Sequence, residues 1–275
     1  MPEGLEAEIY RRSAVACVGR TIEAVQVDDM QPEAIEIRAS LPGSTVTSVG
    51  RHGKLVLVEL HTEGIVPGTI PSVVHRNGGD LTLGLHFGMT GRLIIDGAAA
   101  IDRLEYGSNR DDPAWNRLII TFVGGQVLRV NDPRRWARFT MEPDDERLGP
   151  DVLSLTRADL AVGTAKRQRA LKAVLLDQTV IAGFGNLCVD EVLWHASLDP
   201  RRPAGGLSSR ELGRLWRTTI AELPAMLGRG GSHTGTINPA LRASGGPCPR
   251  RSCCGHLQRG EVGGRTTIWC PSHQR

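Results

Sequence analysis

The sequence predicts a multidomain α+β protein: an N-terminal helix and a block of short strands, then a helical segment and a small cysteine-rich module. Region 19–142 holds short β-branched runs separated by Gly, Pro, Asn and Asp, a pattern typical of a sandwich or barrel. Helical spacing replaces this pattern over 155–231, and four of the six cysteines fall between Cys248 and Cys270. A chain of 275 residues has room for about two domains.

Residues 3–18 are predicted to form the first helix. Pro2 suits a helix start, where a missing N–H costs nothing. Glu3 and Glu6 lie in the first turn, where the helix dipole favours acids. The N-terminal region should therefore begin with this helix and continue into strands.

The strand block is divided by its turn residues. The predicted strands cover 21–28, 53–60, 80–88, 92–97, 117–130 and 135–141. A long loop is expected over 64–79, and 148–154 is a plausible linker. These breaks divide the chain into predicted domains at 1–147, 148–243 and 244–275.

The helical segment carries its own start and stop signals. Helices are predicted over 165–178, over 187–196 and from Ser208 to near 228–231. Gly183 and Gly185 in GFGN separate the first two. Ser208 with Glu211 three residues later forms a capping box, which marks the start of the third.

Composition and charge exclude some functions. No apolar run reaches the roughly 18 residues that span a bilayer, which excludes an integral membrane protein. The first residues include acids and lack the apolar stretch of a signal peptide, so a cytoplasmic location is expected. Residues 201–275 hold twelve Arg and three acids. This basic end favours a polyanionic partner, of which nucleic acid is the usual one.

The C-terminal cysteines have the spacing of a metal site. Cys270 and His273 form one pair of ligands, and Cys248 forms the other pair with Cys253 or Cys254. The two pairs are separated by fifteen or sixteen residues, which suits a β-hairpin zinc finger. Four protein ligands would make the zinc structural, with one ion per chain; the alternative is a set of free thiols.

Two positions could carry covalent chemistry. Removal of Met1 would expose the secondary amine of Pro2, and an α-amino group titrates near ~7.7–8.0. Such an amine attacks an aldehyde or acetal carbon and forms an iminium, while Glu3 could act as a general acid. Lys54 is the only lysine before residue 166, which indicates a need for a compact ammonium. Taken alone, Pro2 could simply follow Met1, and Lys54 could be a surface lysine in a turn.

Several further motifs favour contact with nucleic acid. The turn Gly183–Asn186 before a helix resembles a phosphate cradle, to which Lys172 could add a charge. The segment DPRRW places two arginines beside an aromatic residue, and Met89 could be a second wedge between bases. The alternative is that the aromatic residue and Met89 lie in the core.

In this order the motifs resemble the formamidopyrimidine-DNA glycosylase / endonuclease VIII (Fpg/Nei) family over nearly the whole chain. The matching segments are MPEGLE, HGKLVLVEL, LHFGMTG, NDPRRW, LLDQTVIAGFGNLCVDE and GGRTTIWCPSHQ. The resemblance implies an N-terminal helix with a β-sandwich, a helix–two-turn–helix domain and a C-terminal zinc finger, with DNA in the cleft between them. It also implies a bifunctional DNA glycosylase/AP lyase that removes oxidised bases through a Schiff base on Pro2, with β- and δ-elimination.

The resemblance assigns a role to each matching residue. Pro2 would be the nucleophile at C1′ of the damaged nucleotide, and Glu3 the acid that helps open the sugar. Lys54 would assist β-elimination, and Arg265 would grip a phosphate and assist δ-elimination. The residues expected to bind DNA are Met89, Arg134, Arg135, Trp136, Lys172 and Asn186. The implied partner of a monomeric enzyme is double-stranded DNA with damaged bases or abasic sites.

Four departures from the family pattern bear on these expectations. Leu5 stands where proline is usual, and Trp136 replaces a phenylalanine. The first pair of zinc ligands is stretched, and His273 is the last ligand. Segment 230–248 is short where the family carries a longer loop over the everted base, so 8-oxoguanine, ring-opened purines and oxidised pyrimidines all remain open as substrates. The alternative function is a non-catalytic or narrowly specialised damaged-DNA-binding protein on the same fold.

Overall fold

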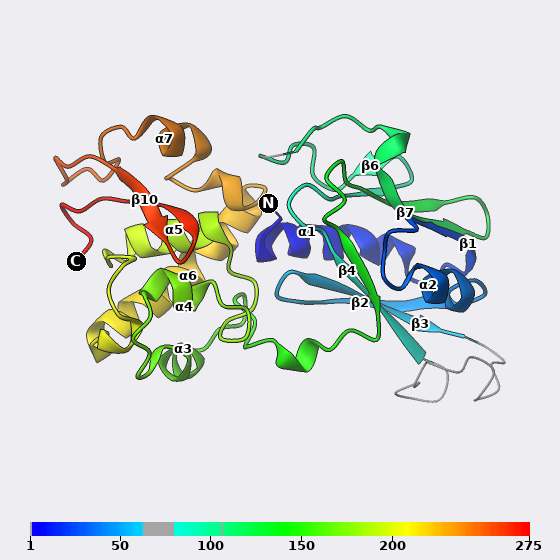
Figure 1. Ribbon diagram of the computed structural model, residues 1–275, viewed down its shortest axis with the longest axis horizontal. Coiled ribbons are helices and arrows are strands. Elements are labelled where there is room, and N and C mark those ends of the chain that lie inside the picture. Colours follow the sequence, from blue (N-terminus) through cyan, green and yellow to red (C-terminus); the bar gives the residue numbers. More distant parts are fainter. Residues whose placement is uncertain (1, 63–79, 106) are drawn as a thin grey trace. The chain divides into compact units, whose positions relative to one another are not determined.

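The computed structural model describes residues 2–62, 80–105 and 107–275 (Figure 1). The chain forms two compact units: the first comprises Met1–Pro2 and Ala7–Asp145, and the second comprises Glu3–Glu6 and Glu146–Arg275. The loop predicted over 64–79 lies outside the described residues. No helix in the described ranges is long and apolar enough to cross a membrane.

The first unit is a sandwich of two antiparallel sheets. One sheet has the strand order β1-β7-β8-β5-β6 and the other β2-β3-β4-β9. Their bounds are β1 (Ile22–Val27), β2 (Thr45–His52), β3 (Leu55–His61), β4 (Asp80–His86), β5 (Arg92–Ile95), β6 (Ala98–Ala99), β7 (Asn116–Phe122), β8 (Val127–Asn131) and β9 (Arg138–Met141). Val56 and Leu83 of one sheet share a core with Leu118 and Leu128 of the other. The expected β-sandwich is confirmed, because apolar residues of both sheets meet in that core.

Two helices contribute to the first unit, the first of them only from Ala7 onward. Helix α1 (Gly4–Ala14) continues into the short 3-10 helix η1 (Val15–Cys17), which confirms the helix predicted over 3–18. Helix α2 (Ala34–Ser40) lies in the region predicted as mostly strands and was not predicted. It buries Ile37 and leaves Ile35 82% exposed, so its apolar residues do not form a clear helical stripe. A further 3-10 helix is η2 (Pro113–Trp115).

The second unit contains short helices and one hairpin. The helices are α3 (Arg157–Thr164), α4 (Leu171–Leu175), α5 (Asn186–His195), α6 (Ser209–Gly228) and α7 (Pro239–Ser244), with 3-10 helices η3 (Asp145–Arg147), η4 (Ala204–Gly206) and η5 (Ser232–Thr234). The hairpin is β10 (Gln258–Val262) and β11 (Arg265–Trp269). The capping box of Ser208 and Glu211 is present at the start of α6, as predicted.

The helix predicted over 165–178 is largely wrong. Helix α3 has already ended at Thr164, and Lys166 adopts a left-handed φ of +58° that interrupts helical geometry. The chain becomes helical again only over Leu171–Leu175, where the Leu171 N–H donates to the carbonyl of Arg202. A contact to a distant segment therefore replaces the local helix that the pattern predicted.

Candidate functional site

The N-terminal turn is anchored to the start of helix α5. One carboxylate oxygen of Glu3 accepts a hydrogen bond from the N–H of Leu187 at 2.8 Å, and the other accepts from Cys188 at 3.0 Å. The Gly4 N–H donates to the carbonyl of Gly183 at 2.8 Å. Because Leu187 and Cys188 lie in the first turn of α5, Glu3 acts as the cap of that helix, and the favourable helix dipole adds to its hydrogen bonds.

The glycines of the GFGN turn allow this close approach. A Cβ atom at Gly185 would lie 2.1 Å from Cδ of Glu3. A Cβ atom at Gly4 would lie 2.8 Å from the carbonyl oxygen of Gly183. The expected phosphate cradle is corrected: the anion at this helix N-terminus is the protein's own Glu3 carboxylate, which already occupies two of the free amides.

A second buried carboxylate fixes the same turn. Glu6 accepts hydrogen bonds from the Glu3 N–H at 2.7 Å and from the N–H and hydroxyl of Ser232 at 2.6 and 2.7 Å. Burial, and then the charge of Glu3, raises the pKa of Glu6. The turn that follows the buried Pro2 is thereby fixed at both of its acidic residues.

Asn186 and Arg265 remain available for a ligand. Asn186 is the first residue of α5, and its Oδ1 is buried without a hydrogen-bond partner among the described residues. A buried acceptor without a donor is costly, so this oxygen favours a ligand or a bound water that donates to it. Arg265 begins β11 at the hairpin turn, and its side chain is exposed.

Lys172 was expected to contact DNA, but other protein groups surround its side chain. Its ammonium is fully buried and donates to Oδ1 of Asp190 at 2.7 Å and to the carbonyl of Thr266 at 2.9 Å. The other oxygen of Asp190 accepts from Arg242 at 2.8 Å and from the Ile268 N–H at 3.1 Å. Burial lowers the pKa of Lys172, although Asp190 opposes the shift. The expected contact of Lys172 with DNA is corrected to an internal role, because no part of its side chain reaches the surface.

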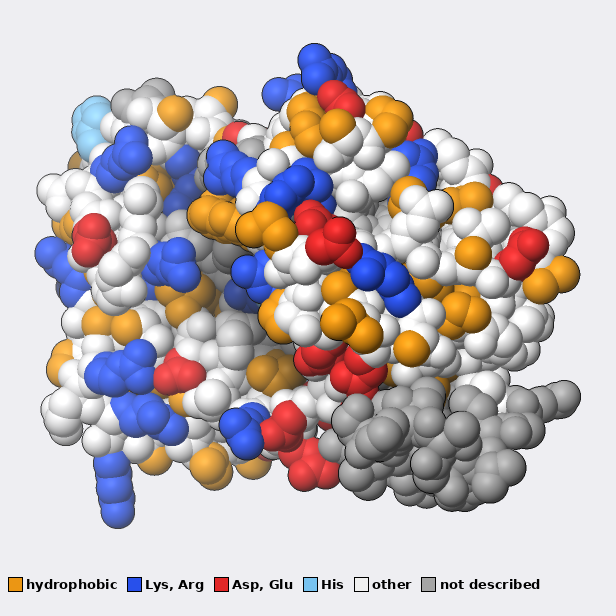
Figure 2. Space-filling model, turned by 45° about the vertical axis from the view of Figure 1, so that its right-hand side comes forward, with side chains coloured by type: hydrophobic (Ala, Val, Ile, Leu, Met, Phe, Trp, Pro, Cys, Tyr) orange, Lys and Arg blue, Asp and Glu red, His pale blue; other side chains and the backbone are white. Residues whose placement is uncertain are grey.

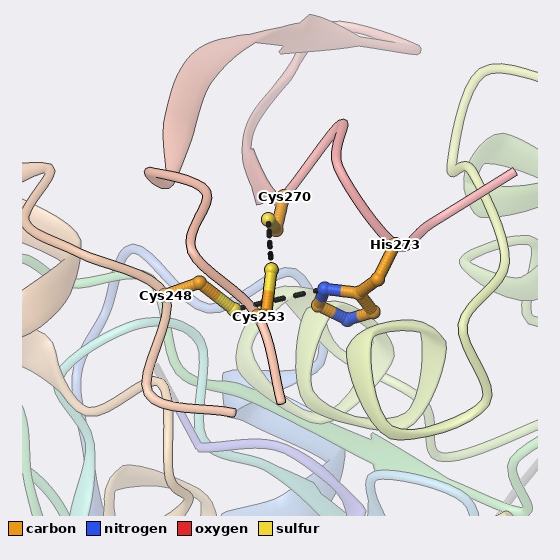
Figure 3. A group of neighbouring side chains, drawn as sticks. All are labelled: Cys248, Cys253, Cys270 and His273. Atoms are coloured by element: carbon orange, nitrogen blue, oxygen red, sulfur yellow. Dashed lines mark hydrogen bonds between the residues drawn. The ribbon is translucent and has the colours of Figure 1, made fainter. Parts of the chain in front are cut away.

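Three cysteines and one histidine form a cluster that can hold a metal ion (Figure 3). The ligand atoms of Cys248, Cys253, Cys270 and His273 all lie within 4.8 Å of one another. Cys254, the first choice for the second ligand, is exposed and lies outside the cluster, so the alternative, Cys253, takes its place. Adjacent cysteines point in different directions here, and only one of them faces the other three ligands.

The surroundings of the cluster orient its ligands. The ring nitrogen Nε2 of His273 lies 3.2 Å from the carbonyl of Trp194, which leaves Nδ1 facing Cys248 at 3.6 Å. The indole N–H of Trp194 donates to Sγ of Cys248, and the Gly255 N–H donates to Sγ of Cys253, both at 3.4 Å. Such contacts fix the histidine tautomer and stabilise thiolates, as around a bound metal.

Lys54 lies in the turn between β2 and β3 of the first unit. Gly53, with a φ of +59°, makes this two-residue turn possible. His86 at the end of β4 lies near Lys54: burial lowers the pKa of His86, and the charges of Lys54 and Arg138 lower it further. This end of the four-stranded sheet therefore carries concentrated positive charge, which favours an anionic ligand.

Met89, Arg134 and Trp136, here called the wedge residues, lie in two loops of the first unit. Trp136 is 50% exposed, and the Arg134 guanidinium lies 5.8 Å from the centre of its ring. Arg135 is instead turned toward Asp28, with 3.5 Å between Nε and the carboxylate. The half-exposed indole of Trp136, with the Arg134 guanidinium beside it, leaves an aromatic side chain available for contact with a ligand.

The two units match two family models in sequence. Residues 1–139 match the formamidopyrimidine-DNA glycosylase N-terminal domain, and residues 148–237 match the formamidopyrimidine-DNA glycosylase H2TH domain. The chain belongs to the formamidopyrimidine-DNA glycosylase (Fpg/Nei) family.

Full-length relatives support the assignment, and solved structures share the fold. The chain is 32% identical to a formamidopyrimidine-DNA glycosylase of Geobacillus kaustophilus and 31% identical to one of Paracoccus denitrificans, with all of each chain covered. A solved structure of MutM with DNA containing carbocyclic 8-oxo-G is similar with a TM-score of 0.77 and 25% identity over all of both chains. Fpg of Lactococcus lactis with abasic-site DNA has a TM-score of 0.76, with 23% identity over 99% of each chain.

Two residues near the predicted site were not predicted as part of it from the sequence. Glu6 was predicted only as an acid in the first turn of the helix, and His86 was not singled out, although each lies within three residues of a predicted site residue, Glu3 or Met89. Their signal was position: Glu6 ends the segment MPEGLE, and His86 lies in the segment LHFGMTG. Figure 2 shows Lys and Arg side chains scattered among acidic and hydrophobic side chains.

Proposed function

We propose that this chain is a bifunctional DNA glycosylase and AP lyase that acts on oxidised bases in double-stranded DNA. The observation that carries the proposal is the anchored N-terminal turn, in which Glu3 and Glu6 hold the residue next to Pro2 in place. Relatives that the chain covers in full are named formamidopyrimidine-DNA glycosylases. Structural neighbours were solved with abasic-site DNA and with DNA containing an oxidised pyrimidine. A monomer in the cytoplasm suffices for this activity.

The chemistry begins at the amine of Pro2 after removal of Met1. Its nitrogen bonds to C1′ as the bond from C1′ to the damaged base breaks, and the base leaves with that electron pair. The attacking nitrogen is then an ammonium, whose proton passes to the Glu3 carboxylate. Glu3 gives this proton to the sugar ring oxygen as the ring opens, and the freed lone pair of the Pro2 nitrogen forms the double bond to C1′, so that a Pro2 iminium remains. The positive iminium accepts the electrons released when C2′ loses a proton, and the 3′ phosphate leaves in the β-elimination.

The remaining residues act on the DNA backbone and the gap in the duplex. Lys54 contacts phosphate and assists the first elimination, while Arg265 grips phosphate and assists the δ-elimination. Asn186 donates through its side-chain Nδ2 to a phosphate oxygen at the lesion. The wedge residues fill the space of the everted base, with Arg134 facing the orphan partner, because a base must leave the stack to be excised.

The metal at the cysteine cluster is zinc in this proposal. With zinc–sulfur bonds of about 2.3 Å, tetrahedral geometry separates two sulfurs by roughly 3.8 Å. The 3.6 Å between the sulfurs of Cys253 and Cys270 fits this value. All four positions belong to protein ligands, so the ion supplies structure to the hairpin that bears Arg265.

Borohydride trapping on a duplex with an abasic site tests the lyase mechanism. We expect wild-type protein to form a covalent adduct, and mass mapping should place it on Pro2. The chain has only three lysines, Lys54, Lys166 and Lys172, so an adduct on a lysine is readily recognised. Pro2→Gly should trap poorly, and Pro2→Glu, which keeps Met1, should not trap at all.

The same experiment addresses the alternative function. Protein with Met1 removed and metal bound that binds the duplex but forms no adduct would be a damaged-DNA-binding protein without catalysis. An adduct on Lys54 would instead make the lysine the nucleophile. A panel of duplexes with 8-oxoguanine, ring-opened purine or oxidised pyrimidine then identifies the substrate.

A further inference from the structure

The loop Asp132–Ala137 is built around one buried carboxylate. Asp132 is fully buried, and one of its oxygens accepts from the hydroxyl of Thr90 and from the Arg134 N–H at 3.1 Å. The other oxygen accepts from the N–H groups of Trp136 and Ala137 at 2.7 and 2.8 Å. A single side chain thereby satisfies three backbone donors of the loop.

The backbone of Asp132 is held as firmly as its side chain. Its N–H donates to the carbonyl of Trp115 at 2.8 Å, and its carbonyl accepts from Nε of Arg117 at 2.8 Å. Arg117 lies in β7 and is itself buried. The carboxylate is therefore fixed to the five-stranded sheet, and the loop is fixed to the carboxylate.

The bond to Thr90 extends this anchor to a second loop. Thr90 follows Met89 in the turn Phe87–Gly91, which is closed by a 2.9 Å hydrogen bond from the Gly91 N–H to the Phe87 carbonyl. The two loops also touch through their backbones: a Cβ atom at Gly88 would lie 2.6 Å from the carbonyl carbon and oxygen of Trp136. The turn that bears Met89 and the loop that bears Trp136 are thus tied together at two points.

We propose that Asp132 is a positioning residue that holds the three wedge residues as one rigid body for insertion into the DNA stack. The proposal rests on the proposed function above. Asp132 cannot touch DNA itself, because its side chain is fully buried. The wedge side chains must separate stacked bases, and they cannot do so if the loops that carry them move when they contact the DNA. Because the Asp132 carboxylate accepts hydrogen bonds from both loops, the loops cannot move independently.

Asp132→Asn tests the proposal without a change of size. The amide presents a donor where the carboxylate accepts, so it cannot pair with all of the loop N–H groups. We expect kcat for excision of a lesion base from duplex DNA to fall on the order of 100-fold, as for misplaced groups remote from the chemistry. Incision of single-stranded DNA with a preformed abasic site needs no wedge and should change little. A fluorescent purine analogue beside the lesion should show slower insertion.

A second pair of variants addresses the Met89 side alone. Thr90→Val removes the hydroxyl and should reduce duplex excision, whereas Thr90→Ser keeps the hydroxyl and should restore it. Ser44→Ala is the matched control. Ser44 is another buried hydroxyl of the first unit, bonded to Thr62 at 2.6 Å and belonging to neither loop. It should leave the ratio of the two activities unchanged.

The outcomes separate this proposal from the proposed function. Wild-type protein that neither excises nor incises would contradict the proposed function itself. An active wild type whose Asp132→Asn variant loses both activities equally would make Asp132 merely structural. Equal activity of Thr90→Val and Thr90→Ser would overturn the link between the two loops. Selective loss of duplex excision, restored by serine, would establish the positioning role.

Discussion

At the scale of single residues, the carboxylate next to Pro2 caps a helix far along the chain. Glu3 lies 184 residues before Leu187, yet it binds the first turn of α5 as an adjacent capping residue would. The MPE motif predicts that Glu3 matters but not what it touches, because its partners are backbone amides that no sequence pattern marks. The choice between Cys253 and Cys254 was open for a similar reason, since the direction of a side chain depends on local backbone geometry.

Gly185→Ala should separate Glu3 from α5. The added methyl would overlap Cδ of Glu3 at 2.1 Å, so the carboxylate must leave the two amides. Leaving those buried donors unpaired costs roughly 1–3 kcal/mol of unfolding free energy. If the chain has the proposed function, we expect duplex incision to fall by about 100-fold, because displacement of the turn next to Pro2 misaligns the reacting groups.

Gly206→Ala provides the control for this prediction. Gly206 lies in the same unit, and a Cβ atom there meets nothing within 4 Å. Denaturant unfolding and incision rates should match the wild type. Normal incision by Gly185→Ala would show that the close approach of Glu3 to the turn is unimportant for activity.

At the scale of secondary structure elements, local patterns succeed where an element buries one regular face. Strand β2 was missed because a bulge between Val46 and Ser48 shifts its register, so its buried valines, Val46 and Val49, do not alternate. The helix predicted over 165–178 failed because backbone bonds to the distant segment 200–203 override local propensity. Long strands such as β3 and β4, with regular alternation and no bulge, were predicted closely.

The buried network of Lys172 joins elements that the sequence separates widely. Helices α4, α5 and α7 contribute Lys172, Asp190 and Arg242, and β11 contributes backbone groups. Lys172→Met should lower the unfolding free energy by roughly 3–5 kcal/mol, because it breaks a buried ion pair and leaves Asp190 with too little positive charge. Denaturant titration measures the loss.

Lys166→Met is the matched control for this network. Lys166 is exposed, and removal of its charge should alter stability by no more than about 0.5 kcal/mol. Equal stability of the two variants would mean that the network contributes no net stabilisation. A hairpin that still binds metal in Lys172→Met would locate the loss in the helices rather than at the cysteine cluster.

At the scale of the whole molecule, the order of strands, helices and cysteines was enough to predict the fold class. A strand-rich region followed by a helix-rich region cannot share one regular layer, so separate cores are expected. The division into units was harder to predict from the sequence. The first turn of α1 belongs to the second unit because it forms hydrogen bonds with residues 184 to 226 positions further along the chain. Sequence periodicity contains no information on contacts at such separations.

Removal of the metal should affect the two units differently. Cys253→Ser, or a chelator, should release the ion and loosen the hairpin and the core around Trp194 in the second unit. Hydrogen exchange should speed up there, while the sandwich core of the first unit stays protected. Cys254→Ser is the control and should retain one ion per chain. Metal loss from Cys254→Ser with retention in Cys253→Ser would reverse the ligand assignment.

The contacts of the first turn also have a consequence for synthesis on the ribosome. The N-terminus is synthesised first. Glu3 can form its hydrogen bonds only after residues 187–188 have been synthesised, and Glu6 only after Ser232. Strands of the first unit can pair much earlier, because their contacts are closer in sequence. The segment translated first is therefore among the last to reach its final place. An incomplete nascent chain would carry Pro2 without the contacts that fix the turn beside it.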